Sequence, residues 1–316
     1  MPPATPAGAR VVDTGAGPVE YHLTPGDGPV VLASHGGWGG WDQARVLLDW
    51  LDPAQYRLLS VSRPGYLGTP LASGRTMEDQ ADLFAALLDA LDIERAAVVA
   101  VSSGGPPGYL LAARHPDRVW AVVGIAAVTG HHEAPQVGRI AQALFTSRPG
   151  QLLMAQLIRR RPAWMLHQLF RGESHLRGRQ IDVNVEYVLG APDALAFLRA
   201  FMDTTTPYAP RRPGTDNDTE QQGRPVRLPL DRVRCPTLVV HGTHDADVDF
   251  SDCVHAHESI PGAERFWIQA GSHLGFWLSP HASEAQAAAR DFLDRHRSVD
   301  PSTTSVAAVP RCYGGR

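Results

Sequence analysis

The chain has 316 residues, of which 43% are hydrophobic and 20% charged, ordinary proportions for a folded globular protein. Its formal net charge of -4 provides no positive field to attract nucleic acid or anionic lipid, so we expect neither as a partner. All 29 basic residues are arginines, and a chain without lysine excludes a lysine Schiff base and a phosphate loop ending in Gly-Lys.

The sequence predicts a cytoplasmic protein whose cysteines are reduced. Residues 1–12 contain one arginine and no apolar stretch follows them, which argues against a secretory signal. The longest apolar run, residues 119–128, is much shorter than the roughly 18 residues of a membrane helix. Cys235, Cys253 and Cys312 are odd in number and widely spaced, so they fit neither a disulfide framework nor a zinc ribbon.

Short apolar runs alternate with longer stretches of helical period up to residue 128. The run 96–102 is apolar almost throughout, which is typical of a parallel strand buried on both faces. Thr76, followed by two acidic residues, predicts the N-cap of a helix. The predicted strands are residues 19–22, 30–34, 57–62, 96–102 and 119–128, and the predicted helices are residues 42–51, 77–91 and 107–114.

Helical patterns dominate from about residue 130, at 136–145, 152–158, 163–170 and 193–202, and a polar loop rich in Pro and Arg follows over 204–227. Strand patterns resume at 235–240 and 265–269, and a last helix follows Ser279-Pro280 and ends near Arg297. Alternating strands and helices indicate an α/β fold with a doubly wound, mostly parallel sheet. We assign residues 1–130 and 231–298 to this core, 131–230 to a helical insertion and 299–316 to a flexible tail.

The segment 100–107, Ala-Val-Ser-Ser-Gly-Gly-Pro-Pro, carries the clearest chemical signal. A buried strand ends there, small residues form a tight turn, and a helix begins with its positive end directed at the turn. Ala100 and Gly104 flank Ser102, which suits a nucleophile held where strand and helix pass closely. Ser103 is a rival nucleophile, but a valine would then occupy the crowded position, and a nucleotide-binding turn is the other reading.

This segment resembles the nucleophile elbow of the α/β-hydrolase fold family, with Ala100 in place of the usual first glycine. Further segments resemble the family's motifs in the same order, over residues 19–130 and 231–297. They are an oxyanion loop at 35–39, an Asp-Arg-Pro-Gly-Tyr-Gly turn at 62–68 with Ser for Asp and one added Leu, the acid segment at 241–248, and the histidine segment at 271–273.

The resemblance implies a catalytic triad and an oxyanion hole. Ser102 is the expected nucleophile, and because a serine hydroxyl is a poor nucleophile, it needs His273 as general base and later general acid. Asp245 would fix the tautomer of the imidazole and stabilise the imidazolium. The main-chain N–H groups of Gly37 and Ser103 would bind the oxyanion. We expect no cofactor and no metal ion.

Other residues compete for these roles. Asp247 and Asp249 are rival acids, but Asp245 lies three residues after a glycine, as in the family. Histidines at 131–132 and at 255 and 257 match no familiar metal-ligand spacing, which favours ordinary loop or surface positions.

Aromatic residues gather around the predicted site, and Trp38, Tyr66 and Phe276 are candidates for lining a substrate pocket, with ordinary packing as the alternative. The insertion resembles the helical cap of many family members. Residues 216–218, Asp-Asn-Asp, lie in its predicted terminal loop, where we assign them no role beyond turn hydrogen bonds.

These residues predict a serine hydrolase that cleaves a small or medium carboxylic ester through an acyl-enzyme. The same triad also suits a lactone, an amide or peptide, a carbon–carbon bond or cofactor-free perhydrolysis, and a non-catalytic receptor of this fold is a further alternative. We expect a small-molecule substrate, whose identity the sequence leaves open, as it does the oligomeric state.

Overall fold

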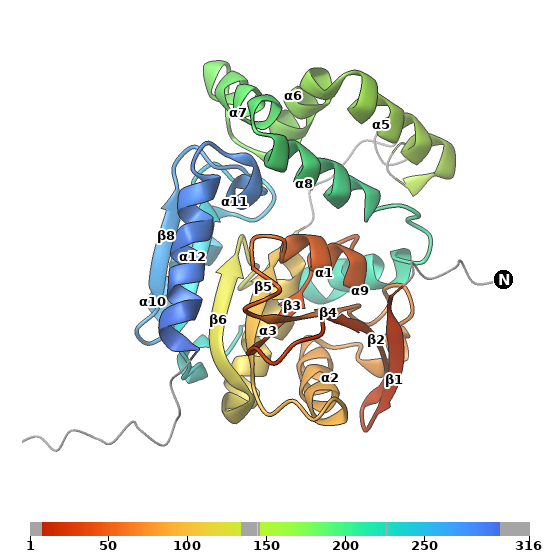
Figure 1. Cartoon of the computed structure of the whole chain (residues 1–316), viewed down its shortest axis with the longest axis vertical. Coiled ribbons are helices and arrows are strands. Elements are labelled where there is room, and N and C mark those ends of the chain that lie inside the picture. Colours follow the sequence, from red (N-terminus) through yellow and green to blue (C-terminus); the bar gives the residue numbers. More distant parts are fainter. Residues whose placement is uncertain (1–7, 134–143, 145, 225–226, 298–316) are drawn as a thin grey trace, which may run out of the picture.

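The computed structural model describes residues 8–133, 144, 146–224 and 227–297, and its centre is one sheet of eight strands (Figure 1). In chain order the strands are β1 (Arg10–Thr14), β2 (Gly17–Leu23), β3 (Val30–Ser34), β4 (Arg57–Val61), β5 (Ala96–Val101), β6 (Val119–Ile125), β7 (Thr237–Gly242) and β8 (Glu264–Ile268). Across the sheet their order is β1-β2-β4-β3-β5-β6-β7-β8. Strands β3 to β8 run parallel, and β2 pairs antiparallel with both β1 and β4, which confirms the predicted mostly parallel α/β sheet.

Alternate residues of the central strands feed two separate hydrophobic clusters, one on each face of the sheet. Val31 and Ala33 of β3 belong to one cluster, and Val30 and Leu32 belong to the other. Burial on both faces explains why these strands are apolar throughout rather than alternating. On the Val31 face pack α1 (Trp41–Leu47), α11 (Gly275–Leu278) and α12 (Ala282–His296), and on the Val30 face pack α2 (Met77–Ala90), α3 (Gly105–Arg114) and α10 (Phe250–Ser259).

Helix α2 begins where its capping signal predicts. The side chain of Thr76 accepts a hydrogen bond from the N–H of Asp79, and the carboxylate of Asp79 accepts one from the N–H of Thr76. This reciprocal capping box satisfies two main-chain donors that the first turn leaves without partners.

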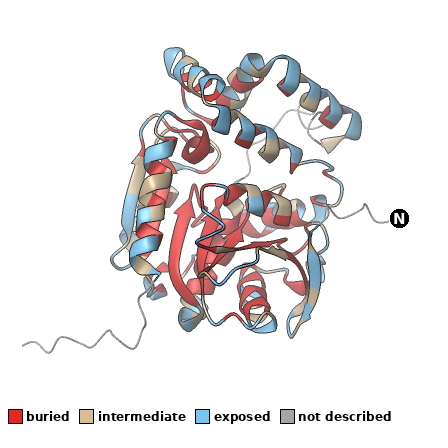
Figure 2. Cartoon of the chain, in the orientation of Figure 1, coloured by how far each residue is buried: buried red, intermediate tan, exposed pale blue. Residues whose placement is uncertain are grey.

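Among the described residues between β6 and β7, five helices follow one another: α5 (Arg148–Arg160), α6 (Pro162–Glu173), α7 (Arg179–Gly190), α8 (Pro192–Asp203) and α9 (Arg212–Gln222). We call them the inserted helices. In Figure 1, α5 to α8 lie above the carboxyl ends of the strands, whereas α9 lies low against the core. Figure 2 shows the contrast in burial between the central strands of the sheet, which are buried, and the outer faces of α5, α6 and α7, which are exposed.

Helix α9 contradicts the loop predicted over residues 204–227. The helix contains no large apolar residue and so has no apolar stripe. It nevertheless has a buried face, which consists of the polar residues Asn217, Asp218, Gln221 and Gln222. These four positions follow the helical period, so α9 buries a polar face rather than an apolar one. Residues 216–218 accordingly lie within a helix and not in a turn.

Several boundaries also differ from prediction. The strand predicted at 119–128 ends at Ile125, and α1 ends four residues before the predicted end at 51. Helix α12 begins at Ala282 rather than directly after Ser279. Strand β1 and helices α7, α10 and α11 have no counterpart among the predicted elements. The helix predicted at 136–145, apart from residue 144, and the tail at 299–316 lie outside the described residues.

Within the part of the chain that the structure describes, no helix has both the length and the apolar character needed to cross a membrane.

Candidate active site

Four segments that carry predicted site residues meet at one edge of the sheet. Parallel strands end at the same edge, so the loops after β3, β5, β7 and β8 all lie there. Ser102 follows β5, Asp245 follows β7, and His273 follows β8. The loop after β3 contains Gly37.

Ser102 lies in a tight turn with a strained backbone. Its φ is +52°, in the left-handed region that few residues other than glycine adopt. Gly104 makes the turn possible, because a Cβ atom there would lie 2.2 Å from the carbonyl oxygen of Ser34. The side chain of Ser102 is at the start of a 3-10 turn that leads into α3, with 8% of the residue exposed.

The loop after β3 lies directly beside this turn. A Cβ atom at Gly36 would lie 3.1 Å from the Cβ of Ser102, and one at Gly37 would lie 3.7 Å from the Oγ of Ser103. A side chain at residue 36 would therefore crowd Ser102, whereas the distance at residue 37 is an ordinary van der Waals contact.

His273 and Asp245 are in direct contact. Nδ1 of His273 lies 2.8 Å from Oδ2 of Asp245, whose Oδ1 accepts hydrogen bonds from the N–H groups of Asp247 and Val248. His241 approaches the same Oδ2 at 3.3 Å. Burial opposes ionisation of Asp245, but His273 and His241 outweigh it and hold the pKa of this carboxyl well below its usual range.

The other ring nitrogen of His273 faces a second carboxylate. Nε2 lies 3.3 Å from Oδ2 of Asp247, and among the described residues the structure contains no hydrogen bond between Nε2 and the hydroxyl of Ser102. Burial lowers the pKa of His273, but Asp245, Asp247 and Glu173 together raise it to about 10. The imidazole is therefore held as an imidazolium in this arrangement.

Glu173, the last residue of α6, places a carboxyl group from the inserted helices near His273, Asp245 and Asp247. Its carboxylate accepts a hydrogen bond of 3.4 Å from Ser272, and its carbonyl accepts one from the N–H of Ala246. Burial raises the pKa of Glu173 to about 8, with a further contribution from the nearby aspartates. No sequence pattern pointed to this residue, because its position depends on how α6 packs on the loop after β7.

Two of the three aromatic residues predicted to line a pocket are packed inside the protein. Tyr66 is fully buried, and its hydroxyl donates to Oδ2 of Asp218 at 2.6 Å. Phe276 is 1% exposed and packs against aromatic rings of the core. Neither ring lines one of the two cavities described below, so the burial of these residues gives their predicted pocket role no support.

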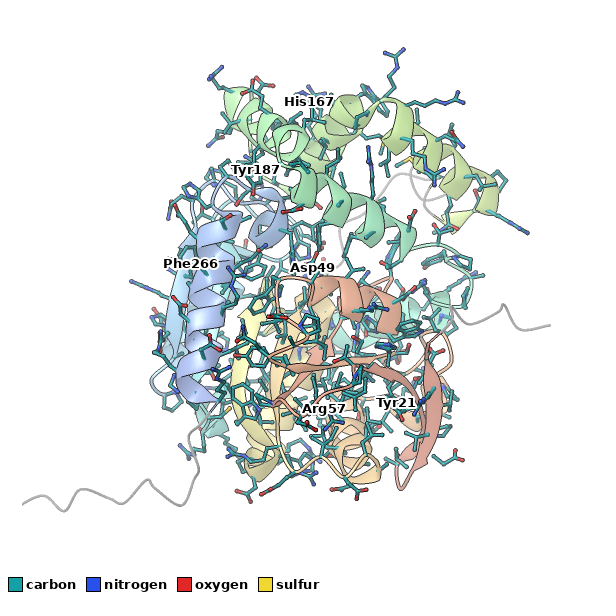
Figure 3. The ribbon with its side chains drawn as sticks, viewed as in Figure 1. Tyr21, Asp49, Arg57, His167, Tyr187 and Phe266 are labelled. Carbon is teal, nitrogen blue, oxygen red and sulfur yellow. The ribbon has the colours of Figure 1, made fainter. Side chains whose placement is uncertain are left out.

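Trp38 remains at the edge of the site. It is half-buried, it has a positive φ of 62°, and its ring lies 4.9 Å from that of Tyr208 in the inserted segment. Figure 3 labels Tyr187 of α7, on the side of the inserted helices, and Asp49 after α1, on the side of the core.

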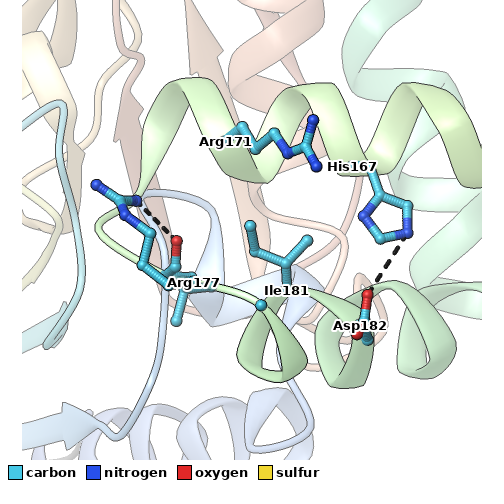
Figure 4. Close-up of a pocket in the computed structure, with 7 residues that line it drawn as sticks. His167, Arg171, Arg177, Ile181 and Asp182 are labelled. Atoms are coloured by element: carbon cyan, nitrogen blue, oxygen red, sulfur yellow. Dashed lines mark hydrogen bonds and ion pairs between the residues drawn. The ribbon is translucent and has the colours of Figure 1, made fainter.

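One cavity lies beside the acid of the cluster and another lies on the inserted helices. The first has a volume of about 180 Å³ and is rich in carboxylates and histidines: His131, His132, Glu133, His175, Asp245, Ala246, Asp247, Asp249 and Asp252. The second, of about 450 Å³, lies between α6 and α7, where His167 pairs with Asp182 (Figure 4). No predicted site residue lines the second cavity. Among the described residues, no group of three His, Cys, Asp or Glu side chains is arranged to hold a metal ion.

The order of the strands, the strained serine turn and the adjacent His–Asp pair define the class of α/β proteins with a hydrolase fold. The chain belongs to the alpha/beta hydrolase fold family, whose model matches residues 29–280.

Similar proteins agree with this assignment over most of the chain. A solved alpha/beta hydrolase fold protein from Nakamurella multipartita is 36% identical, with a TM-score of 0.86, over 90% of this chain and 99% of that one. The uncharacterized hydrolase YcgS of Bacillus subtilis is 27% identical over 282 residues, 88% of this chain and 95% of the relative. A pimeloyl-[acyl-carrier protein] methyl ester esterase of Neisseria meningitidis is 27% identical over 278 residues, 86% of this chain and 80% of the relative.

Proposed function

We propose that the protein is a serine hydrolase that cleaves a small or medium carboxylic ester through an acyl-enzyme. The contact of 2.8 Å between His273 and Asp245, at the sheet edge that also carries the strained Ser102, is the observation that carries the proposal. The family assignment supports a hydrolase, and the ester named for the Neisseria relative supports this bond type. The inserted helices would form a cap over the site.

In the first half of the reaction, His273 first loses its Nε2 proton to water, and the neutral Nε2 then leaves Asp247 and takes the proton of the Ser102 hydroxyl. The serine oxygen attacks the ester carbonyl, and the N–H groups of Gly37 and Ser103 stabilise the oxyanion that forms. Collapse of this intermediate breaks the bond to the alkoxy group, which receives the proton from His273. The products are the alcohol and an ester of Ser102.

In the second half, water replaces the alcohol. His273 removes a proton from the water as it attacks the acyl-enzyme, and the same N–H groups stabilise the second oxyanion. The bond to Ser102 then breaks, and His273 returns the proton to the serine oxygen. Asp245 remains ionised throughout and stabilises the imidazolium, as its low pKa favours.

The test compares Ser102→Ala with Ser103→Ala, using an activated aryl ester and a fluorophosphonate probe. We expect Ser102→Ala to abolish both turnover and covalent labelling. Ser103→Ala should still be labelled, because the proposal uses only the main-chain N–H of residue 103. Undiminished turnover in Ser102→Ala would refute the proposal. Labelling lost only in Ser103→Ala would transfer the nucleophile to that residue.

We propose a cytoplasmic enzyme without a cofactor, acting on a small molecule. Cys235 and Cys253 are free thiols, which supports a reducing compartment.

A further inference from the structure

Helix α9 lies behind both main-chain segments that carry the N–H groups of the oxyanion hole in the proposed function. It contacts the loop after β3 through the buried Arg63, and it contacts the serine turn through Gln222. Neither contact belongs to the triad, and both come from the segment for which the sequence predicted only a polar loop.

Arg63 is fully buried, and all its guanidinium nitrogens are engaged. Nε donates to the carbonyl of His35 at 2.9 Å, and Nη2 donates to the carbonyl of Gly36 at 3.3 Å. Asp218 of α9 accepts from Nη1 at 2.8 Å and from Nη2 at 2.5 Å. This bidentate pair fixes the guanidinium in one plane and neutralises a charge that burial would otherwise make very costly.

His35 provides a second hydrogen bond to the carbonyl of Gly36. Its Nε2 accepts a hydrogen bond from the N–H of Arg63, so its Nδ1 carries the proton and donates to the carbonyl of Gly36 at 2.7 Å. Burial and the charge of Arg63 hold the pKa of His35 well below its usual range, which keeps this neutral tautomer. The carbonyl of Gly36 thus has two donors.

The carbonyl of Gly36 and the N–H of Gly37 belong to one peptide group. Because a trans peptide is planar, its C=O and N–H point in opposite directions. Fixing the carbonyl toward Arg63 and His35 therefore fixes the direction of the N–H on the other side. Hydrogen bonds to the carbonyl also polarise the peptide and make its N–H a better donor.

Gln222 acts on the second N–H group. Its Nε2 donates to the carbonyl of Ser103 at 2.9 Å. The N–H and the C=O of one residue are separated by only two torsions, so holding the carbonyl restricts the orientation of the N–H. Gln222 is itself buried, which limits the positions its amide can take.

We propose that α9 orients both N–H donors of the oxyanion hole, with Asp218 acting through Arg63 on the Gly36–Gly37 peptide and Gln222 acting on Ser103. Asp218, Arg63 and Gln222 are positioning residues that never touch the substrate. The inference rests on the proposed function, because it assigns Gly37 and Ser103 the role of binding an oxyanion.

The test uses Asp218→Asn, Gln222→Met and the matched control Glu220→Gln. Glu220 lies on the same helix and also pairs with arginine, at 2.9 Å from Arg75, but this pair is exposed. Each variant is assayed for kcat and KM with an aryl ester and for inhibition by an aryl trifluoromethyl ketone, whose adduct with serine places an oxyanion in the hole.

We expect Asp218→Asn and Gln222→Met to lower kcat by about 10- to 100-fold, because a donor displaced by about 1 Å loses this much. KM should change by less than about twofold, and the affinity for the ketone should fall by the same factor as kcat/KM. Glu220→Gln should behave as the wild type. A loss confined to KM, or ketone affinity that does not follow kcat/KM, would overturn the proposal.

Thermal unfolding separates a positioning effect from a loss of folding. If Asp218→Asn fails to fold, Gln222→Met leaves no buried charge unpaired and decides the question: unchanged kcat in that variant overturns the proposal. Turnover that survives in Ser102→Ala would instead reject the proposed function and this inference with it. Loss of activity in Ser102→Ala, with wild-type kcat in both α9 variants, would reject the inference alone.

Discussion

The carboxylates of Asp245 and Asp247 together hold the imidazole of His273 in its protonated form, which cannot act as a base, and Asp247 is the one that faces Nε2. It lies 3.3 Å from Nε2, the nitrogen that must accept the proton of Ser102. Its negative charge stabilises the imidazolium, so its removal should lower the pKa of His273 and free Nε2. Asp247→Asn keeps the size of the side chain and removes the charge.

The expected shift follows from the separation of the two charges. At 3.3 Å, Coulomb's law gives about 1.3 kcal/mol with the dielectric constant of water, which corresponds to about one pKa unit. The side chain of Asp247 is 32% exposed and that of His273 is 11% exposed, so the medium is less polarisable than water and the shift is larger. We expect a decrease of about one to two units.

The assay is the pH profile of kcat/KM with an aryl ester. In the wild type, activity should increase with pH toward the pKa of His273, which is raised to about 10. In Asp247→Asn the profile should level off about one to two pH units lower, and activity at pH 7 should increase about tenfold for each unit.

The control for this prediction is Asp249→Asn. This nearby aspartate caps α10 by accepting from the N–H of Ser251 and makes no contact with His273 among the described interactions, so its profile should match the wild type. An Asp247→Asn profile that is unchanged, or that shifts to higher pH, would show that this ion pair does not control the base.

Three further outcomes are expected. Gly104→Ala should destabilise the fold by about 1–3 kcal/mol and reduce fluorophosphonate labelling, since its Cβ would lie 2.2 Å from the carbonyl oxygen of Ser34; urea unfolding measures this, and Gly190→Ala, with open space around its Cβ, should be neutral. Glu173→Gln should leave kcat/KM unchanged below pH 7, where the wild-type carboxyl is protonated. Above pH 8 that carboxyl ionises and stabilises the imidazolium, so the variant should there have the higher kcat/KM and the lower apparent pKa of the base. A difference already present at pH 6 would contradict this. Esters with a terminal carboxylate should have higher KM than neutral esters of equal length, with a difference that salt reduces, because the carboxylates of Asp245 and Asp247 both lie beside the base; equal KM values at low salt would count against this electrostatic argument.

The central strands of the sheet and the start of α2 were predictable because their signals are local. The strand at residues 30–34 and the start of α2 after Thr76 match the structure, since an unbroken apolar run and a capping box each lie within a few residues. The turn at Ser102 was also predictable, because strand, small residues and helix follow one another directly. Its positive φ and the required Gly104 give the physical reason for that pattern.

The contacts of Asp247 and Asp218 were not predictable in the same way. Asp247 was considered only as a rival to Asp245 for the role of the acid, whereas it contacts Nε2 of His273 while Asp245 contacts Nδ1. Asp218 meets Arg63 across 155 positions of the chain, and a polar residue in a polar stretch carries no sign of burial. Tyr66 was read as a pocket residue because an aromatic ring near a site resembles a lining residue until its burial is known.

Two buried arginines, Arg63 and Arg211, attach α9 and the residue before it to the core. A helix with a polar buried face gains little from the hydrophobic effect, so it must dock through hydrogen bonds that match in geometry. Arg63 with Asp218, and Arg211 with Asp42, provide two such pairs, both bidentate and both with a fully buried guanidinium. Arg211 additionally donates to the carbonyl of Gly39, so the loop after β3 is held at both ends. A lysine ammonium carries its three donors on one nitrogen, so it cannot form the bidentate carboxylate pair and also reach the carbonyls of His35 and Gly36, which makes these arginines unsuited to exchange with lysine.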